Sequence, residues 1–133
     1  MWFDGSCLPT NPGKETIGAV IVKDQNGTIV YKNSLREDHE SITSSNYAEY
    51  VGLELGIDWL ISNKDKVSKV NVFGDSNMVI FQAQGKWKIK EGRYYTHKAR
   101  TVYKKTYENS LNDCLEFNWI PREENHEADE LTK

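Results

Sequence analysis

The spacing of the apolar residues changes part-way along the chain. The first third has the apolar and β-branched residues of strands, and its Asn26-Gly27 turn is typical of a hairpin. Three strands are therefore predicted, at residues 1–6, 16–24 and 28–37. From residue 44 the period becomes helical, because apolar side chains recur at intervals of three and four; these are Tyr50, Leu53, Ile57 and Leu60. A chain with this order is expected to pack helices against a sheet.

The rest of the chain alternates between the two periods. Strands are predicted at residues 68–75 and 114–121, and helices at residues 44–63, 76–85 and 94–111, with a last helix beginning near residue 122. Ser44, Ser45 and Asn46 suit the start of the first helix, and Gly85 suits the end of the second. A meander followed by alternating helices and strands predicts an α/β protein with a mixed sheet.

Length and composition limit the class of protein. A chain of 133 residues suits one domain, predicted here to span residues 1–133. Charged residues make up 28% and hydrophobic residues 38%, which is typical of a soluble globular protein. No apolar run approaches the roughly 20 residues of a membrane span, and no signal segment opens the chain, so we expect a cytoplasmic protein without a membrane partner. Cys7 and Cys114 are expected to be free thiols, although a bridge between them stays open.

Charge is distributed unevenly along the chain. Residues 86–105 contain eight basic residues and a single acid, Glu91, whereas the rest of the chain holds nine basic residues and 19 acids. One face of such a protein could follow a phosphate backbone. Taken alone, the segment is more often the solvated face of a helix, and the net charge of −3 does not favour a nucleic acid partner.

Four acids stand at positions that could bring them together. Asp4 and Asp75 are each predicted at the end of an apolar strand, Glu49 in the first turns of a helix and Asp129 in the last helix. Each one alone is most simply an N-cap or a surface acid. Four clustered carboxylates repel one another unless cations compensate them, and oxygen ligands suit Mg²⁺ and Mn²⁺. Clustering would therefore imply a divalent metal site.

Four short motifs contain these acids: FDGS at residues 3–6, NYAEY at 46–50, FGDSN at 73–77 and ENHEADEL at 124–131. In order and spacing they resemble the four motifs of the type 1 ribonuclease H family, and the resemblance covers almost the whole chain. It implies the ribonuclease H-like fold, a five-stranded mixed sheet whose first three strands are antiparallel, flanked by helices. It also implies a single catalytic domain that acts on RNA–DNA hybrids.

The resemblance implies a set of functional residues. Asp4, Glu49, Asp75 and Asp129 would bind two Mg²⁺ or Mn²⁺ ions, with Asp4 as the bridging ligand. Two such ions about 4 Å apart activate a water and stabilise the leaving oxygen in an in-line displacement. The RNA strand would be cut to 5′-phosphate and 3′-hydroxyl ends. Glu49 is also expected near the RNA 2′-hydroxyl, the group that distinguishes RNA from DNA.

Substrate contacts are implied in the same way. The residues at matching positions are Gly5, Ser6, Asn11, Ser44, Ser45, Asn46, Asn77, Trp87 and Asn125. Contacts to sugar and phosphate read helical form more than base sequence, so little sequence preference is expected. We expect a monomer that binds RNA–DNA hybrid, with activity on double-stranded RNA left open. Two alternatives remain: a non-catalytic hybrid- or duplex-binding module, and a nuclease domain of a larger replicative protein.

The chain departs from the family pattern before its last helix. Many bacterial members carry a histidine in that loop, whereas residues 119–125 contain none, and His126 matches a variable helix position. Arg122 is the candidate for the catalytic role of the missing histidine, and it would hold a phosphate rather than accept a proton. The alternative for Arg122 is an ion pair with Glu123 or Glu124.

A second departure lies in the basic segment. Many bacterial members insert a basic protrusion there, whereas here Gly85 leads through residues 86–93 directly into one helix. The resemblance is therefore to an archaeal-like short form that lacks both the protrusion and the loop histidine. Lys86, Trp87, Lys88, Lys90 and Arg93 could still contact a DNA strand, with Trp87 either a platform for a sugar or a core residue.

Overall fold

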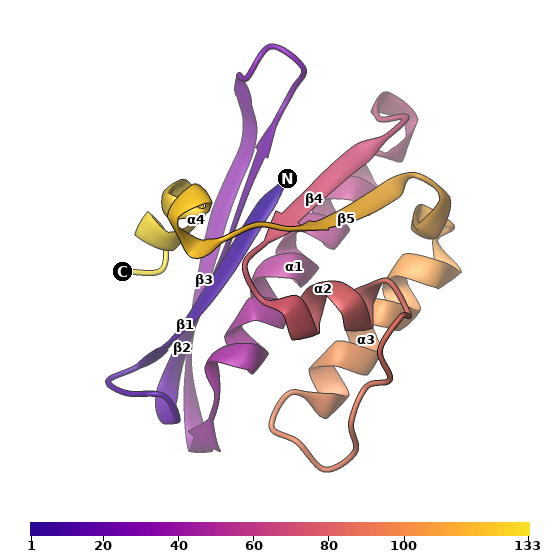
Figure 1. Cartoon of the computed structure of the whole chain (residues 1–133). Coiled ribbons are helices and arrows are strands. Elements are labelled where there is room, and N and C mark those ends of the chain that lie inside the picture. Colours follow the sequence, from indigo (N-terminus) through magenta and orange to yellow (C-terminus); the bar gives the residue numbers. More distant parts are fainter.

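The computed structural model describes all 133 residues as one five-stranded sheet with four α-helices (Figure 1). The strands are β1 (Trp2–Leu8), β2 (Gly13–Lys23), β3 (Ile29–Thr43), β4 (Val70–Gly74) and β5 (Leu115–Trp119). The helices are α1 (Ser45–Ser62), α2 (Asn77–Ala83), α3 (Thr96–Glu108) and α4 (His126–Glu130). The 3-10 turns η1 (Lys64–Lys66), η2 (Leu111–Asp113) and η3 (Arg122–Glu124) lie between them.

The sheet is mixed, with the strand order β3-β2-β1-β4-β5. β2 pairs antiparallel with β1 and β3, and β4 pairs in parallel with β1 and β5. This confirms the predicted fold, including the antiparallel arrangement of the first three strands. The parallel pairing of β1 with β4 is limited to Trp2 and Phe73. The two strands separate beyond this pair, and Asp4 and Asp75 follow at the point of separation.

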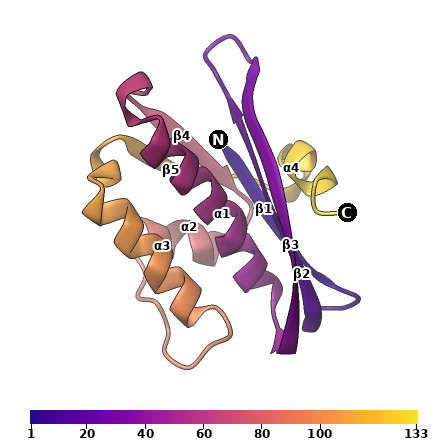
Figure 2. The same cartoon turned by 180° about the vertical axis from the view of Figure 1, so that it is seen from behind.

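Helices cover the two faces of the sheet unequally. α1, α2 and α3 lie together on one face, whereas α4 lies alone on the other, against β1 and β2 (Figures 1 and 2). The predicted helical stripe is buried, since Leu53, Ile57 and Leu60 belong to one core with Phe3 and Val20 of the sheet. That core anchors β1 and α1 rigidly under the site described below. None of the helices is both long and apolar enough to cross a membrane.

Three features of the strands and helices differ from the predicted ones: the position of Asp4 in β1, the end of β3 and the start of α3. Asp4 is the third residue of β1 rather than its last, because pairing with β2 continues to the end of β1. β3 continues past its predicted end at Glu37 to Thr43, which pairs with Gly13 of β2 after a register shift. α3 begins at Thr96, because the side chain of this residue bonds the backbone of the preceding turn.

The connection between α2 and α3 is a loop, residues 84–95. Gly85 ends α2 as predicted, with a φ of +82° that glycine adopts without strain. No helix is inserted before α3, so the basic protrusion is absent, as predicted. We call residues 84–95 the basic loop, because it carries four exposed cations: Lys86, Lys88, Lys90 and Arg93.

Helix α1 approaches the sheet more closely than side chains would allow. A Cβ atom at Gly52 of α1 would lie 2.6 Å from the carbonyl oxygens of Asp4 and Ala19. A Cβ atom at Gly5 of β1 would lie 2.2 Å from the backbone nitrogen of Glu49. Only glycine fits at such contacts. They bring the turn of α1 that carries Glu49 against β1, beside Asp4.

Replacing Gly52 with alanine should destabilise the protein, whereas replacing Gly56 in the same helix should not. Alanine gains about 1 kcal/mol of helix propensity over glycine at either position. At Gly52 the new methyl meets backbone oxygens, so we expect a net loss of about 1–3 kcal/mol. At Gly56 it meets the flexible end of the Met1 side chain, which can move. Urea unfolding measures both variants, and equal stabilities would contradict the close contact.

Candidate metal centre and nucleic-acid interface

Three of the four predicted acids meet where β1 and β4 separate. Carboxylate oxygens of Asp4, Glu49 and Asp75 all lie within 4.8 Å of one another. The register of the sheet places the two aspartates, since each stands two residues beyond the Trp2–Phe73 pair. The glycine contacts of α1 place Glu49 beside them. The predicted clustering of these acids therefore occurs in the folded chain.

Burial and mutual repulsion make these carboxyls hold their protons tightly. Asp4 is 5% exposed and Glu49 is 7% exposed. Burial, reinforced by the charge of Asp75, raises the pKa of Asp4 to about 6. Burial, and then the charge of Asp4, hold the pKa of Glu49 well above its usual value. The ionised cluster is therefore unfavourable unless positive charge compensates it.

Asp129, the fourth predicted ligand, reaches the cluster from α4. Its carboxyl helps to raise the pKa of Asp4, although it is not one of the three groups whose oxygens lie within 4.8 Å of one another. Two cations face it from the surface: Arg122 Nη2 lies 3.9 Å from Oδ1, and Lys133 Nζ lies 3.6 Å from Oδ2. Arg122 thus belongs to the site and makes no ion pair with the two glutamates that follow it.

Asn125 supports the cluster from inside the protein. Its side-chain amide donates to Asp75 Oδ2 at 3.0 Å and to the carbonyl of Phe3 at 2.9 Å. It therefore ties the start of α4 to β1 and to the end of β4. Asn125, which was predicted to contact substrate, is 1% exposed, and its donor is used within the protein. It orients the side chain of Asp75.

Trp119 is a supporting residue that sequence reasoning did not single out. Its indole Nε1 donates to the backbone carbonyl of Asp75 at 3.0 Å. Directly after Asp75, the Ser76 hydroxyl accepts the amide of Val79 at 3.3 Å and so begins α2. The backbone of Asp75 is held on both sides. No local signal in the sequence reveals the role of Trp119, because the contact crosses from β5 to the end of β4.

Asn11 and Ser45 form a reciprocal pair at the start of α1. The Asn11 amide donates to Ser45 Oγ at 2.9 Å, and its carbonyl oxygen accepts the backbone amide of Ser45 at 3.0 Å. Asn11 therefore caps α1 from the loop between β1 and β2. Ser44 is the N-cap residue, as predicted, but its hydroxyl makes no capping bond. The paired side chains form a polar edge at the end of the helix that carries Glu49.

Two other residues predicted to contact substrate are engaged within the protein. The hydroxyl of Ser6 donates to the carbonyl of Thr132 at 2.9 Å, which holds the segment after α4 to β1. At Gly5, the space that a side chain would need is filled by the backbone of α1. Both residues thus help to shape the site.

The remaining predicted residues lie at the surface. Asn77 is exposed at the first position of α2, and Asn46 is half-buried in the first turn of α1. Trp87 is 50% exposed, with its ring centroid 4.9 Å from that of Phe81, so it is a surface platform and not a core residue. His126 is exposed at the first position of α4, which agrees with the prediction of a solvated helix residue.

The basic segment divides into two parts. Every lysine and arginine of α3 has an ionic partner: Lys98 and Lys105 bond Glu54 of α1 at 2.9 and 3.1 Å, and Arg100 and Lys104 pair with nearby glutamates. The four cations of the basic loop have none. The positive charges of α3 therefore help to pack this helix against α1, whereas those of the basic loop are not neutralised.

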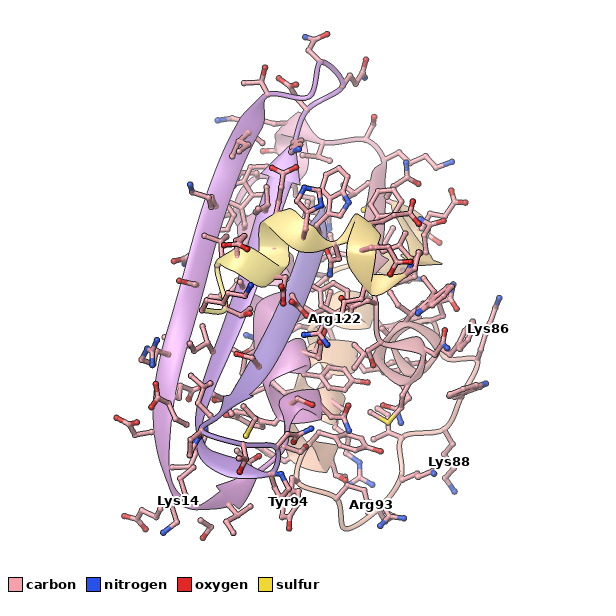
Figure 3. The ribbon with its side chains drawn as sticks, turned by 60° about the vertical axis from the view of Figure 1, so that its left-hand side comes forward. Lys14, Lys86, Lys88, Arg93, Tyr94 and Arg122 are labelled. Carbon is pink, nitrogen blue, oxygen red and sulfur yellow. The ribbon has the colours of Figure 1, made fainter.

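The unneutralised cations of the basic loop lie to one side of Arg122 (Figure 3). Lys86, Lys88 and Arg93 extend outward along the basic loop, Lys14 extends from the start of β2, and Arg122 lies between the two groups. The loop also presents the rings of Trp87 and of Tyr94, which is 61% exposed. Exposed rings interleaved with unpaired cations are typical of surfaces that bind nucleic acid.

The donor set fits a hard divalent cation. It consists of carboxylate oxygens alone, which Mg²⁺ and Mn²⁺ prefer. The buried Oε2 atom of Glu49 has no hydrogen-bond partner. An unsatisfied buried acceptor is costly, and a bound cation would satisfy it while compensating the neighbouring charges.

Comparison with known proteins identifies the family. The sequence matches the family model described as reverse transcriptase-like over residues 2–133. LC11-RNase H1, isolated from compost by a metagenomic approach, is 32% identical with a TM-score of 0.82, and the match covers 98% of this chain and 89% of that one. This chain belongs to the ribonuclease H1 family. LC11-RNase H1 is also known in complex with an RNA/DNA hybrid, in a structure whose sequence is 30% identical over 98% of this chain and 91% of that one, with the same TM-score.

Two further relatives show how this ribonuclease H1 fold occurs elsewhere. The N-terminal RNase H domain of Rv2228c from Mycobacterium tuberculosis is 25% identical with a TM-score of 0.74, over 98% of this chain and 86% of that one. The curated bifunctional protein Rv2228c is 29% identical over 123 residues, 91% of this chain, and this chain spans 31% of its length. RNase H1 from Halobacterium salinarum, 23% identical over 98% of this chain and 91% of that one, shares the fold with a TM-score of 0.76.

In a chelator, the cluster should make the protein less stable as the pH rises. The folded state keeps protons on Asp4 and Glu49 that the unfolded chain releases, because their pKa values are raised. The stability from Asp4 is complete below about pH 4 and is lost as the pH rises through about 6. Thermal unfolding should therefore show the Tm of the wild type falling relative to that of Asp4→Asn between pH 4 and 7.

The same thermal unfolding measurement is repeated with a divalent ion in place of the chelator. Adding Mg²⁺ at pH 7 should raise the Tm of the wild type and leave that of Asp4→Asn nearly unchanged, because only the wild type keeps the full set of ligands. A difference between the two proteins that is independent of pH would contradict the raised pKa of Asp4.

Proposed function

We propose that this protein is a metal-dependent endonuclease that hydrolyses the RNA strand of RNA–DNA hybrids and leaves 5′-phosphate and 3′-hydroxyl ends. The observation that carries the proposal is the convergence of Asp4, Glu49 and Asp75 in a member of the ribonuclease H1 family. The complex of LC11-RNase H1 with an RNA/DNA hybrid supports the same substrate class here. Residues 1–133 would form the catalytic domain.

Asp4, Glu49, Asp75 and Asp129 would hold two Mg²⁺ or Mn²⁺ ions. Bound there, the ions supply Lewis-acid activation of water and stabilise charge on the leaving oxygen of an in-line displacement. Asp4 has a carboxylate oxygen within 4.8 Å of those of Glu49 and Asp75, and its pKa also responds to Asp129, so Asp4 would be the carboxylate that is shared. Asn125 occupies Oδ2 of Asp75 and leaves the other oxygen of that group without a hydrogen bond from the protein. The chain thus contributes a rigid set of ligands from β1, α1, the end of β4 and α4.

Arg122 is the positive charge that the protein itself brings to the cluster. Its side chain is 81% exposed and lies 3.9 Å from Asp129. From this position the guanidinium can turn from Asp129 to a phosphate oxygen of the substrate, where it stabilises negative charge but does not accept a proton. Arg122 would therefore take the place of the loop histidine of other members, and His126 would have no catalytic role.

The two strands of a hybrid would contact different parts of the surface. The polar edge formed by Asn11 and Ser45, together with Ser44 and Asn46 at the start of α1 and Asn77 at the start of α2, would read the RNA strand, with Glu49 near the 2′-hydroxyl. The unneutralised cations of the basic loop and the ring of Trp87 would receive the DNA strand. These groups suit sugar and phosphate, so the protein should select helical form and not base sequence.

Asp75→Asn should abolish cleavage and keep hybrid binding. The change removes one carboxylate charge from the cluster but keeps the shape of the side chain, so we expect the rate to fall by more than about 100-fold. Cleavage of labelled hybrid in Mg²⁺ gives the rate, and anisotropy in Ca²⁺ gives the affinity. Near-normal Mg²⁺-dependent cleavage by this variant would overturn the assignment.

The same assay run on labelled hybrid, double-stranded RNA, single-stranded RNA and duplex DNA tests the substrate class. Each substrate is incubated with Mg²⁺, Mn²⁺ or chelator. Cleavage confined to the RNA strand of the hybrid, and lost in chelator, is expected. Binding of every duplex without cleavage in either metal would identify a non-catalytic duplex-binding module instead.

Arg122→Ala should lower activity more than His126→Ala. Loss of a charge-assisted contact to phosphate costs about 2 kcal/mol, which corresponds to a fall of about 10- to 30-fold in kcat. His126 touches no acid of the cluster, so His126→Ala should keep most activity. Steady-state kinetics on the hybrid compares the two variants, and the opposite ranking would show that His126 carries the role.

A further inference from the structure

The basic loop is exposed and carries net positive charge, yet its backbone is held firmly to the core. At its start, the amides of Lys86 and Trp87 both donate to the carbonyl of Phe81, at 2.9 and 3.1 Å. The Trp87 ring packs against the Phe81 ring. These contacts turn the chain out of α2 in one defined direction.

A buried polar pair holds the middle of the loop. Gln82 is 1% exposed. Its side-chain Oε1 accepts a hydrogen bond from the Tyr50 hydroxyl at 2.6 Å, and its side-chain Nε2 donates one to the backbone carbonyl of Lys88 at 3.4 Å. Tyr50 is the residue directly after Glu49 in α1. Two consecutive hydrogen bonds therefore join Tyr50, in the turn of α1 that carries Glu49, to the backbone carbonyl of Lys88 in the basic loop.

The end of the loop returns to the same tyrosine. Tyr95 is buried and stacks on Tyr50, with ring centroids 6.1 Å apart and an interplanar angle of 19°. Next to it, the Thr96 hydroxyl donates to the carbonyl of Lys90 at 2.6 Å and accepts the amide of Arg93 at 2.9 Å. The backbone near each of the four cations is thus bonded inward, while their side chains form no ion pair.

Packing alone does not call for a polar pair at this position. Burying a tyrosine hydroxyl and a glutamine amide costs free energy that their hydrogen bonds only offset, and an apolar pair of the same shape can be equally stable. An apolar pair, however, could not donate a hydrogen bond to the Lys88 carbonyl. The specific effect of Gln82 is therefore on where the loop lies.

We propose that Tyr50 and Gln82 are positioning residues that fix the basic loop relative to Asp4, Glu49 and Asp75, so that one duplex reaches both at once. This inference rests on the proposed function for its substrate class, a nucleic acid duplex with one strand at the carboxylates and the other on the loop. A loop ordered before binding loses less entropy when it meets the phosphates, and it keeps the scissile strand in register.

The test is the double variant Tyr50→Phe with Gln82→Met, which removes the hydrogen bonds and keeps the volume of the core. Hydrogen exchange of the Lys86, Trp87 and Arg93 amides should become at least about tenfold faster than in the wild type, because the loop opens more often. With hybrid, KM should rise about threefold to tenfold while kcat and the Mg²⁺ requirement change little.

The salt dependence of hybrid binding separates a role in positioning the loop from a role in stability alone. Each phosphate contact contributes about 0.9 to the slope of log K against log salt, so a loosened loop should lower the slope by about 1. Lys88→Ala should lower it by a similar amount. Lys32→Ala removes an unpaired cation from β3, away from the loop, and should leave the slope unchanged.

Ile57→Val is the control for general loss of stability, because it trims the core on α1 without touching the loop. It should change neither the exchange of the loop amides nor the salt slope. The proposal is overturned if the double variant keeps wild-type exchange in the loop, or if a loosened loop binds hybrid with unchanged KM and salt slope. If the wild type does not bind hybrid at all, the proposed function fails, and the exchange rates alone still decide whether the pair holds the loop.

Discussion

The close contact between α1 and the sheet is the constraint on which the rest of the site depends. Gly52 and Gly5 allow the helix to approach β1 until backbone meets backbone, and a methyl group at either position would push the two elements apart. That approach places Glu49 beside Asp4. The same turn of α1 carries Tyr50, from which the basic loop is held. The carboxylates and the loop therefore share one rigid support.

The cluster itself works against folding. Asp4 and Glu49 are buried with raised pKa values, and one oxygen of Glu49 has no partner. Several contacts keep the acids together in spite of this repulsion: the Asn125 amide and the Trp119 indole hold Asp75 at its side chain and backbone. Such a costly arrangement is expected where a divalent cation binds and function, not stability, determines the residues.

The distribution of charge follows the same division between support and function. In α3, Lys98 and Lys105 are neutralised by Glu54 and join that helix to α1. The cations of the basic loop, and Lys14 across from them, keep no ionic partner and are exposed to solvent (Figure 3). The charge of the basic segment thus has two uses that its sequence does not separate, because both parts contain four closely spaced lysines and arginines.

Periodicity and short motifs are local properties of the chain, and they were enough to predict the order of the elements, the mixed sheet and the clustering of Asp4, Glu49 and Asp75. Which polar residues stay at the surface and which are used inside the protein follows from the tertiary packing alone. Asn125, Ser6 and Gly5 sit inside motifs and are used within the protein, whereas Asn11 and Ser45 meet at the surface although 34 residues separate them. Trp119 and Gln82 gain their roles from contacts between distant elements. Burial and hydrogen-bond partners depend on how elements pack, and no local pattern encodes them.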